Sequence, residues 1–330
     1  MNTRISTNRR SLWTAAALAA TTLIAAQPAT AQSFPAKPVR FVVGFPPGGG
    51  NDLLARTVGQ KLAELIAQPV VIDNKAGAGG NVAAEQVSHV APDGYTILMM
   101  SSSHPIQKLL KPELTYDPIA DFTPLARLAV YSYILVINPS VEARSVKELV
   151  TLAKAKPGQL NFVSSGNGSG SHLAGELFRI ATSTDLTHIS YKGGAQAITD
   201  LVGGRVQMMF SPIPAVMAQV KSGRMIVVAA TGAQRTQLLP DVPTVAESGF
   251  PGFQVSSWYG VLGPARVPAA IADTLNRQIN AALQAQDVKA RLATEGAEPA
   301  PQTREQFEQL IKSDHDKWGK VIRQTGIRGD

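Results

Sequence analysis

Hydrophobic and polar positions follow a repeated order of strand, glycine loop and helix that begins near residue 39. The apolar run Val39–Val43 predicts a buried strand, and the glycine-rich stretch 44–50 predicts a loop after it. Apolar residues then recur at helical spacing behind an N-cap at Asn51 or Asp52: Leu54, Val58, Leu62 and Leu65. A strand at 70–72, a helix at 81–90 and a strand at 95–100 follow. This alternation favours a parallel sheet covered by helices.

A second series of the same kind starts near residue 134. Its predicted strands are 134–137, 161–163, 187–190, 206–210 and 225–230. Its predicted helices are one that begins at the capping box of Ser145 and Glu148, and others at 172–180, 197–201 and 215–222. The stretch 239–253, rich in Pro and Gly, predicts a connection. The final elements, which we expect to pack on the first series, are a strand at 258–262 and helices at 268–284, 287–295 and 304–323, the last capped by Thr303.

The two series, joined by crossings near residues 130 and 250, predict two lobes with a cleft between them and a hinge of two strands. A chain of 330 residues is long enough for about two domains. We place lobe 1 at residues 32–131 together with 254–330, and lobe 2 at residues 132–253. In open α/β sheets ligands bind beyond the carboxyl ends of the strands, which is where the glycine loops of both lobes would lie.

Residues 1–31 have the organisation of a cleaved secretory signal peptide. Arg4, Arg9 and Arg10 precede the apolar run 15–26, and Ala29-Thr30-Ala31 offers a cleavage site. We therefore expect an exported protein, and the pair Arg9-Arg10 matches twin-arginine export only poorly. No apolar stretch of about 18 residues follows the leader, so the sequence predicts no transmembrane helix after it.

Composition and charge exclude several classes of protein. With 44% hydrophobic and 17% charged residues, the mature chain is predicted to be globular and water-soluble. Loss of the leader removes three arginines and no acid, which lowers the formal net charge from +7 to +4. The remaining cations are scattered singly, which argues against nucleic-acid binding, while a mild positive excess suits an anionic ligand. The absence of cysteine excludes disulfides, thiolate nucleophiles and cysteine-based metal sites.

Two loops are the candidate binding elements. The first loop, residues 44–52, brings backbone N–H groups to a helix N-terminus, and Gly48, Gly49 and Gly50 allow close approach to a ligand. The serine loop, residues 164–171, adds hydroxyl donors at a second helix start. Two such loops facing one cleft would hold two carboxylates, although a plain tight turn is the alternative interpretation of the first loop.

The fingerprints of other chemistries are missing. The first loop fits neither G-x-x-x-x-G-K-[ST] nor G-x-G-x-x-G, and Asp52 would repel a phosphate. The stretch 166–170 does not place a serine at the centre of a nucleophile elbow. The histidines are isolated from one another and from clustered carboxylates. We therefore expect no metal and no cofactor.

A few side chains have more than one interpretation. His104 and His172 are each a core histidine, a ligand contact or, in an enzyme, a general base. Lys192 is either a solvated cation or a counter-ion for the ligand. Trp258 and Tyr259 either pack the hinge or flank an apolar ligand, and we favour packing.

Several longer motifs occur in a fixed order along the chain. They are Phe45-Pro46-Pro47-Gly48-Gly49-Gly50-Asn51-Asp52, Asp117-Pro118 with Asp121-Phe122-Thr123-Pro124, Gly168-Ser169 with His172-Leu173-Ala174-Gly175-Glu176-Leu177, Tyr191-Lys192-Gly193-Gly194-Ala195 with Asp200-Leu201 and Gly203-Gly204, Pro240-Asp241-Val242-Pro243-Thr244, and Glu247-Ser248-Gly249-Phe250-Pro251-Gly252. Together, and over nearly all of the mature chain, they resemble the tripartite tricarboxylate transporter substrate-binding proteins, also called Bug receptors.

The resemblance implies a two-lobed α/β clamp of the type 2 periplasmic binding protein fold. Such a monomeric receptor closes on an organic carboxylate in the periplasm and delivers it to the permease subunits of a membrane transporter, without catalysis. The resemblance implies that first-lobe loops hold one carboxylate through backbone amides and ordered waters, and that second-lobe loops close over the other end. The predicted ligand contacts are Phe45, Gly48, Gly49, Gly50, Asn51, Ser101, Ser102, Ser103, His104, Ser165, Asn167, Gly168, Ser169, His172, Gly193, Gly194 and Ala195.

The ligand and the role of the receptor stay open at this point. Gln196 stands where the family often has Pro, and Asn51 stands where Ser or Thr is common. Aliphatic dicarboxylates, tricarboxylates, acidic amino acids, aromatic acids and nicotinate-like acids are all compatible with amide recognition. The rival hypotheses are an enzyme of the same fold that uses His104 or His172 as a base, and a sensory domain that presents the same clamp to a membrane kinase.

Overall fold

The structure is a computed structural model that describes residues 34–48 and 50–329 of the chain. The predicted leader at 1–31 and Gly49 of the first loop lie outside these residues. From Lys37 onward the chain forms one compact unit. Within the described ranges, no helix combines the length and the apolar character needed to cross a membrane.

Ten strands of the described residues form one hydrogen-bonded network. They are β1 (Val39–Val43), β2 (Val70–Asn74), β3 (Thr96–Ser101), β4 (Phe122–Ile137), β5 (Asn161–Ser164), β6 (Thr187–Ser190), β7 (Met208–Pro212), β8 (Ile226–Ala230), β9 (Ser256–Pro264) and β10 (Ala297–Pro299). The order is β2-β1-β3-β9-β4-β7-β5-β6, and β8 and β10 pair with β4. Strand β1 is parallel to β2 and β3, and β5 is parallel to β6 and β7. The predicted α/β organisation is therefore confirmed, and the antiparallel pairs all involve β4 or β9.

Helices connect the strands as the alternating pattern predicts. They are α2 (Gly50–Ile66), α3 (Asn81–Ser88), α4 (Gln107–Leu110), α5 (Val146–Ala155), α6 (Gly170–Thr182), α7 (Gly194–Val202), α8 (Ile213–Lys221), α9 (Ala269–Gln284), α10 (Gln286–Thr294) and α11 (Arg304–Thr325), with short 3-10 turns η1 (Ala78–Gly80) and η2 (His104–Ile106). The predicted cap of α11 is confirmed as a full capping box of Thr303 and Gln306. Helix α6 begins two residues earlier than predicted because Ser169 is its N-cap.

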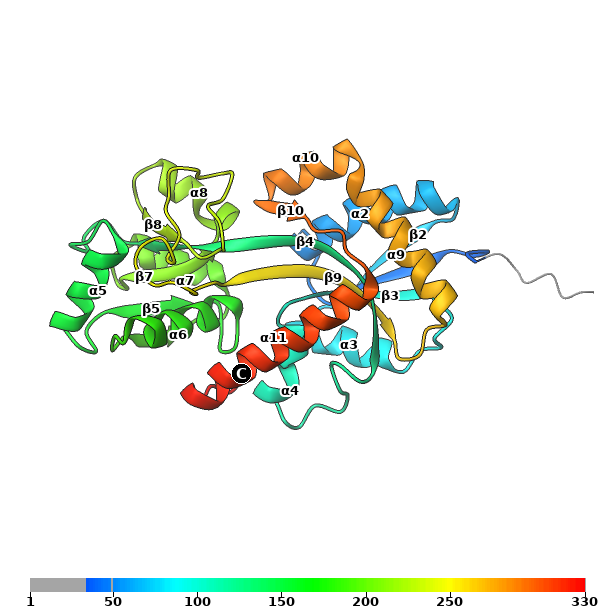
Figure 1. The fold of residues 1–330 in the computed structure, drawn as a ribbon, viewed down its shortest axis with the longest axis horizontal. Coiled ribbons are helices and arrows are strands. Elements are labelled where there is room, and N and C mark those ends of the chain that lie inside the picture. The colour runs from blue at the N-terminus through cyan, green and yellow to red at the C-terminus, as the bar shows by residue number, and fades with distance from the viewer. Residues whose placement is uncertain (1–33, 49, 330) are drawn as a thin grey trace, which may run out of the picture. The chain divides into compact units, whose positions relative to one another are not determined.

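Strand β4 is the long element that joins the two groups of strands (Figure 1). The prediction of a strand at 134–137 was too short, because β4 already starts at Phe122. From Phe122 to Ser132 it pairs with β9, and from Tyr133 onward it pairs with β7 and β8. The last pair with β9 is Ser132 with Ser256. The predicted two-strand hinge is thus formed by β4 and β9, with the crossings at these two serines.

A buried threonine connects the two strands at this crossing. Thr231, which follows β8, is fully buried. Its Oγ1 lies 3.0 Å from the backbone nitrogen of Tyr133, which donates to it, and 2.6 Å from the carbonyl oxygen of Val255, to which it donates. One side chain therefore holds the chain just before β9 to β4 at Tyr133.

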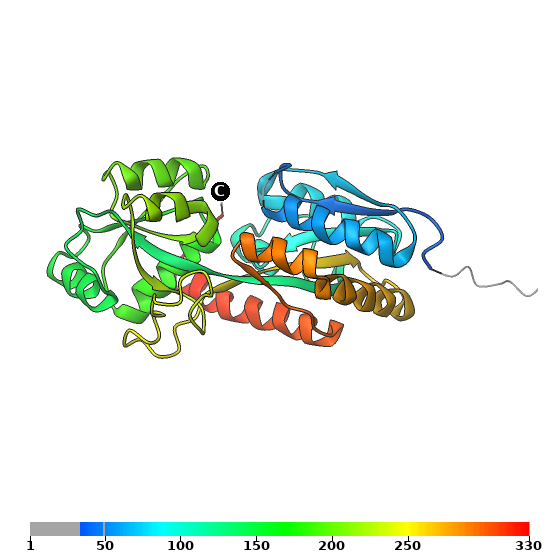
Figure 2. The ribbon, with the colours of Figure 1, turned by 90° about the horizontal axis from the view of Figure 1, so that it is seen from above.

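Separate clusters of buried residues support the two groups of strands. Around the first group they include Val42, Leu98, Met100, Trp258 and Phe307, and around the second they include Ile134, Val136, Val163, Met209 and Val216. Helices α9 and α10 pack against α2, as expected for the first group. Helix α11 behaves differently, because it also packs against α6 and adds Trp318, Val321 and Ile322 to a third cluster with the second group (Figures 1 and 2).

Candidate ligand-binding site

A cavity of about 630 Å³ lies where β4 and β9 pass from one group of strands to the other. Its wall receives residues from the first loop, η1, the turn after β3, the serine loop and the starts of α7 and α8. Both loops that the sequence singled out therefore contribute to one concave surface.

Asp52 folds the first loop onto the N-terminus of α2. Its carboxylate accepts hydrogen bonds from the backbone N–H of Gly48 at 2.9 Å and from the Asn74 side chain at 2.9 Å. The same Asn74 amide donates to the carbonyl of Phe45 at 3.1 Å. Burial raises the pKa of Asp52, but hydrogen bonds from Arg56, Gly48 and Asn74 outweigh it and leave that pKa below its ordinary value. The charge of Asp52 is thus compensated inside the loop, and this side chain does not line the cavity.

Asn51 presents an unpaired polar atom at the cavity wall. It is the second residue of α2, and its buried Oδ1 has no hydrogen-bond partner among the described residues. An asparagine amide offers both a hydrogen-bond donor and an acceptor. A ligand or water oxygen beside Asn51 would satisfy this group.

The turn after β3 contributes a cluster of hydroxyl groups. Ser101, Ser102 and Ser103 all line the cavity. The Ser102 hydroxyl lies 2.7 Å from that of Ser257 on β9, and the Ser101 and Ser103 hydroxyls lie 3.1 Å apart. Gln107 donates to the carbonyl of Ser103 at 3.2 Å and also lines the cavity. The turn is therefore fastened to the hinge strand β9.

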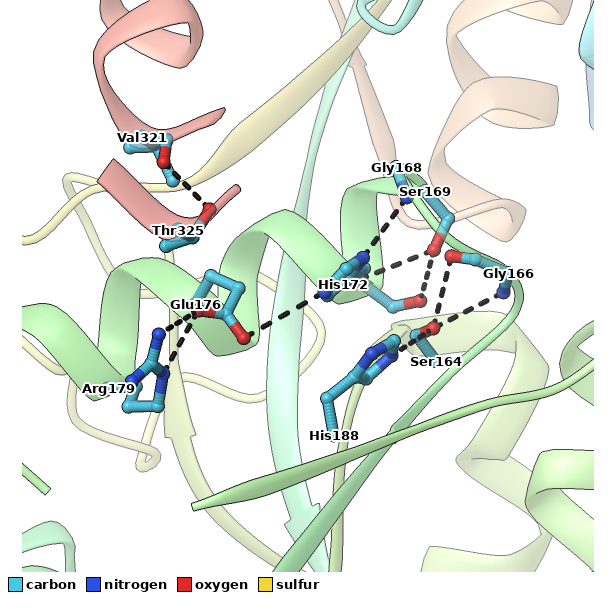
Figure 3. Close-up of polar contacts among 11 residues, drawn as sticks. Ser164, Gly166, Gly168, Ser169, His172, Glu176, Arg179, His188, Val321 and Thr325 are labelled. Carbon is cyan, nitrogen blue, oxygen red and sulfur yellow. Dashed lines mark hydrogen bonds and ion pairs between the residues drawn. The ribbon is translucent and has the colours of Figure 1, made fainter. Parts of the chain in front are cut away.

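The serine loop is held by its own hydroxyl groups (Figure 3). Ser169 caps α6 by accepting the backbone N–H of His172 at 3.3 Å. The hydroxyl of Ser171 accepts the backbone N–H of Ser165 at 3.1 Å. These bonds curl the loop around the start of α6, and residues 165–171 of the loop line the cavity.

Gly168 occupies a position in the serine loop that only glycine suits. Its φ of +71° is in the left-handed region, and a Cβ there would lie 2.5 Å from Leu110 of α4. The serine loop of the second group thus touches α4 of the first group directly.

Three tyrosines of the hinge strands lie next to one another at the cavity. The ring of Tyr131 lies 5.7 Å from that of Tyr133 and 4.9 Å from that of Tyr259. A Cβ on Gly170 would lie 2.0 Å from the Tyr133 hydroxyl, and one on Gly50 would lie 3.0 Å from the Tyr259 hydroxyl. The hinge strands therefore abut the first residues of α6 and α2, the helices that follow the two loops. Burial, reinforced by the neighbouring Tyr131, raises the pKa of Tyr133 and Tyr259, so both phenols stay neutral donors.

The cavity wall is nearly uncharged and combines apolar side chains with many hydroxyl and amide groups. Among the described residues that line it, Lys111 is the one charged side chain, and none is Asp or Glu. The hydroxyl and amide side chains on the wall are Asn51, Ser101, Ser102, Ser103, Gln107, Tyr131, Tyr133, Ser165, Asn167, Ser169, Ser171, Ser211, Ser256 and Ser257. A wall of neutral donors with one cation suits a small anion.

The predicted contacts divide into residues that reach this wall and residues that do not. Those on the wall are Phe45, Asn51, Ser101, Ser102, Ser103, Ser165, Asn167, Gly168, Ser169 and Gly194. Gly50 lines a smaller adjoining cavity instead. Those that line neither are Gly48, His104, His172, Gly193 and Ala195, while Gly49 lies outside the described residues.

His104 is a core residue because η2 turns its ring inward. It is fully buried, with its ring edge against Phe122 at 4.8 Å and Tyr116 stacked at 6.2 Å. Burial lowers the pKa of His104 from 6.5 to about 4, and the Pro118 backbone and Asp117 charge offset this only in part. His104 is therefore a neutral packing residue, which corrects its placement among the ligand contacts.

The structure also shows where Trp258, Tyr259 and Lys192 lie. Trp258 packs edge-on against Phe307 at 5.1 Å and donates its Nε1–H to Asp314 at 2.7 Å, so the packing interpretation of Trp258 is confirmed. Tyr259 stacks on Tyr131 and lines the smaller cavity. Lys192 lines neither cavity.

Several wall residues escaped the sequence reasoning. They are chiefly Tyr131 and Tyr133 of β4, Gln107 and Lys111 around α4, and Trp318 of α11. The spacing of Tyr131 and Tyr133 places both on one face of a strand, a signal that recognition of β4 from Phe122 onward would have exposed. Nothing in the sequence pattern links α11 to the cavity.

The smaller cavity, of about 370 Å³, extends the cleft past Tyr131. Both cavities share Tyr131, Pro212 and Ala215. The rest of the lining of the smaller cavity is largely apolar and includes Leu53, Leu54, Leu292 and Ala297, together with the charged Arg291 and Glu295.

Comparison with known proteins identifies relatives over most of the chain. The family model of the tripartite tricarboxylate transporter family receptor matches residues 54–327. BugT of Bordetella pertussis is 37% identical over 305 residues, which span 92% of this chain and 94% of BugT. A solved R. palustris protein with adipate is 34% identical with a TM-score of 0.78, covering 89% of this chain and 99% of that one. MatC from Rhodopseudomonas palustris with bound malate is 32% identical with a TM-score of 0.74, covering 88% and 100%.

The fold and the cavity define an α/β solute-binding protein. The family match is specific, and the chain belongs to the tripartite tricarboxylate transporter receptors, the family that includes BugT. Other similar solved structures, BugD among them, are periplasmic proteins. The resemblance inferred from the ordered motifs is thereby confirmed.

We predict that His104 makes the protein lose stability in acid. Its pKa is about 4 when folded and 6.5 as an unperturbed group, so the unfolded chain takes up this proton first. The unfolding free energy should therefore fall as pH drops from about 6.5 to about 4, by up to about 3 kcal/mol from this group. His104→Phe keeps an aromatic ring against Phe122 and should flatten this loss. Denaturant titrations across the window measure it, and an equal acid loss in both proteins would contradict the assignment.

Proposed function

We propose that this protein is a periplasmic receptor that captures an organic carboxylate in the cleft and delivers it to the permease subunits of a tripartite tricarboxylate-type transporter. The observation that carries the proposal is the cavity wall, where two loops from different groups of strands present neutral donors around a space with one lysine. Membership of the transporter receptor family supports the permease as the partner. The adipate and malate bound by two similar solved proteins support a carboxylate as the ligand.

The two groups of strands act as lobes in this proposal. Lobe 1 comprises residues 32–131 with 254–330, and lobe 2 comprises 132–253. The crossing of Ser132 and Ser256 supports these limits, because β4 changes partners there. Bending of β4 and β9 would move the serine loop toward the first loop and enclose the ligand. We propose a monomer, since both halves of the site come from one chain.

One carboxylate group would lie at the first loop and the turn after β3. Asn51 with its unpaired amide atom and the three serines of the turn would receive it there. The serine loop and Gly194 would cover the other end of the molecule. Each hydrogen bond to a charged group contributes about 1.5–3 kcal/mol, so three or four net bonds would approach the ~8 kcal/mol of micromolar binding.

An enzyme of the same fold is the rival proposal, and the positions of the histidines disfavour it. A general base must come within hydrogen-bond reach of the substrate. Neither His104 nor His172 lines the cavity.

Carboxylates are predicted to stabilise the protein selectively. Residues 32–330, refolded to remove any carried-over ligand, are heated with a panel that includes adipate, malate, citrate and benzoate. An acid at about 100 times its Kd should add about 2.7 kcal/mol and raise the melting temperature by several degrees. The receptor proposal expects such a rise for one acid or a few related acids, with the acid recovered unchanged. No rise for any acid, or conversion of the acid, would overturn it.

The contact between Gly170 and Tyr133 provides a test of the site itself. Gly170→Ala would place a Cβ 2.0 Å from the Tyr133 hydroxyl, so either the tyrosine or the start of α6 must move. We expect at least about tenfold weaker binding of the most stabilising acid of the panel, because one or more charged hydrogen bonds are lost. Calorimetric titration measures the affinity.

The matched control is Gly203, the glycine that follows the C-terminus of α7. Gly203 follows α7 with φ of −74°, and a Cβ there would make only an ordinary contact of 3.4 Å with Thr199. Gly203→Ala should bind like the wild-type protein. Equal affinities for Gly170→Ala and Gly203→Ala would remove the serine loop from the binding site.

A further inference from the structure

Two histidines lie directly beneath the serine loop, in contact with each other. His172 is in the first turn of α6 and His188 is in β6. Their rings stack at 3.7 Å between centroids with 9° between the planes (Figure 3). His172 is buried, and neither ring lines the cavity. The two histidines therefore contact the serine loop and not the cavity.

The hydrogen bond from Gly168 defines the protonation state of His172. The backbone N–H of Gly168 donates to Nδ1 of His172 at 3.1 Å. A nitrogen that accepts a hydrogen bond carries no proton, so the ring is neutral with its proton on Nε2. That nitrogen lies 3.8 Å from Oε1 of Glu176. A second proton, on Nδ1, would set an N–H against the N–H of Gly168 and break the bond.

His188 holds the other end of the same loop. Its Nε2 lies 2.7 Å from the hydroxyl of Ser164, where the serine loop leaves β5. That hydroxyl also lies 3.1 Å from the carbonyl oxygen of Gly166, to which it donates. The stacked pair therefore fastens the loop both at its start and at Gly168.

The side chains around the pair include an ion pair on α6 and an aromatic ring on β5. On α6 the charged neighbours are Glu176 and Arg179, which are bonded to each other at 2.7 Å. Burial raises the pKa of Glu176, but His172 and Arg179 outweigh it and lower that pKa. Strand β5 supplies the uncharged ring of Phe162, at 4.8 Å from His188 and 6.2 Å from His172.

Two further elements near α6 contribute uncharged groups. Strand β4 places the neutral Tyr133 at Gly170, and α11 packs along α6 with the apolar Trp318, Val321 and Ile322. Two stacked imidazolium rings with centroids 3.7 Å apart would repel each other.

We propose that His172 and His188 are positioning residues for the serine loop, and that the neutral pair keeps the loop ready to bind while its protonation releases the loop and weakens binding. The effect on the ligand rests on the proposed carboxylate receptor, whereas the effect on the loop does not.

The first test uses the ligand-free protein and hydrogen–deuterium exchange of the peptide that contains residues 164–171. After correction for the intrinsic rate, protection of this peptide should fall at least about fivefold from about pH 7.5 to about pH 5.5, because one hydrogen bond of ordinary strength is lost. His172→Asn supplies an acceptor that does not titrate, and it should keep the same protection at both pH values. His172→Leu supplies none and should lose protection at both.

An exposed histidine serves as the control. His89 lies at the end of α3, exposed to solvent. His89→Asn should reproduce the wild-type fall in protection. Constant protection in the wild-type protein, or the same fall in His172→Asn as in the wild-type protein, would overturn the positioning role. Melting temperatures of all variants at about pH 7.5 show whether each is folded.

The second test measures calorimetric affinities for adipate and malate at the same two pH values. Affinity should fall about five- to tenfold in acid for the wild-type protein and for His89→Asn, and by clearly less for His172→Asn. An equal fall in all three proteins would overturn the link from the pair to the ligand. If neither acid binds at about pH 7.5 while the exchange results hold, the choice of ligand in the receptor proposal fails and the positioning role stands.

Discussion

The pairing of β4 is the constraint on which the rest of the structure depends. One strand pairs with β9 up to Ser132 and with β7 and β8 from Tyr133 onward, so a single backbone belongs to both groups of strands. The buried hydroxyl of Thr231, bonded to Tyr133 and Val255, fixes where that change occurs. Because a buried polar group is costly to leave unpaired, this crossing has little freedom to slip in register. The cavity lies beside this crossing, since Tyr131, Tyr133 and Ser256 line it.

Close packing contacts, and not charges, connect the crossing of β4 and β9 to the binding site. The hydroxyls of Tyr133 and Tyr259 abut Gly170 and Gly50, so the hinge strands pack against the first residues of α6 and α2, the helices that follow the serine loop and the first loop. The nearby charge of Asp52 is compensated within its own loop. What remains for an anion is a wall of neutral donors, and such a wall recognises a carboxylate while leaving its carbon skeleton to be selected by the apolar parts of the cleft.

Sequence patterns predicted the elements whose signals are local. The order from Val39 through α2 and the cap of α11 were predicted, because period, caps and glycine loops act over a few residues. The hinge of two strands was predicted from the two crossings between the series of elements. The part of β4 before Ile134 was missed, because irregular pairing between Pro124 and Ala126 and between Arg127 and Ala129 removes the simple alternation of a strand. Tyr131 and Tyr133 lie in this part of β4, so they were not predicted as cavity residues. The burial of the His104 ring and the packing of α11 against α6 depend on tertiary contacts, which a local sequence pattern does not predict.

The most direct test of this account measures whether the two groups of strands approach each other when a carboxylate binds. The chain has no cysteine, so Gln60→Cys on α2 and Lys154→Cys on α5, both exposed positions, place two spin labels without competing sites. Pulsed electron paramagnetic resonance then gives the distance distribution with and without a saturating amount of the acid that stabilises the protein most. The account predicts a shift to a shorter distance on binding. An unchanged distribution with the acid demonstrably bound would contradict closure about β4 and β9.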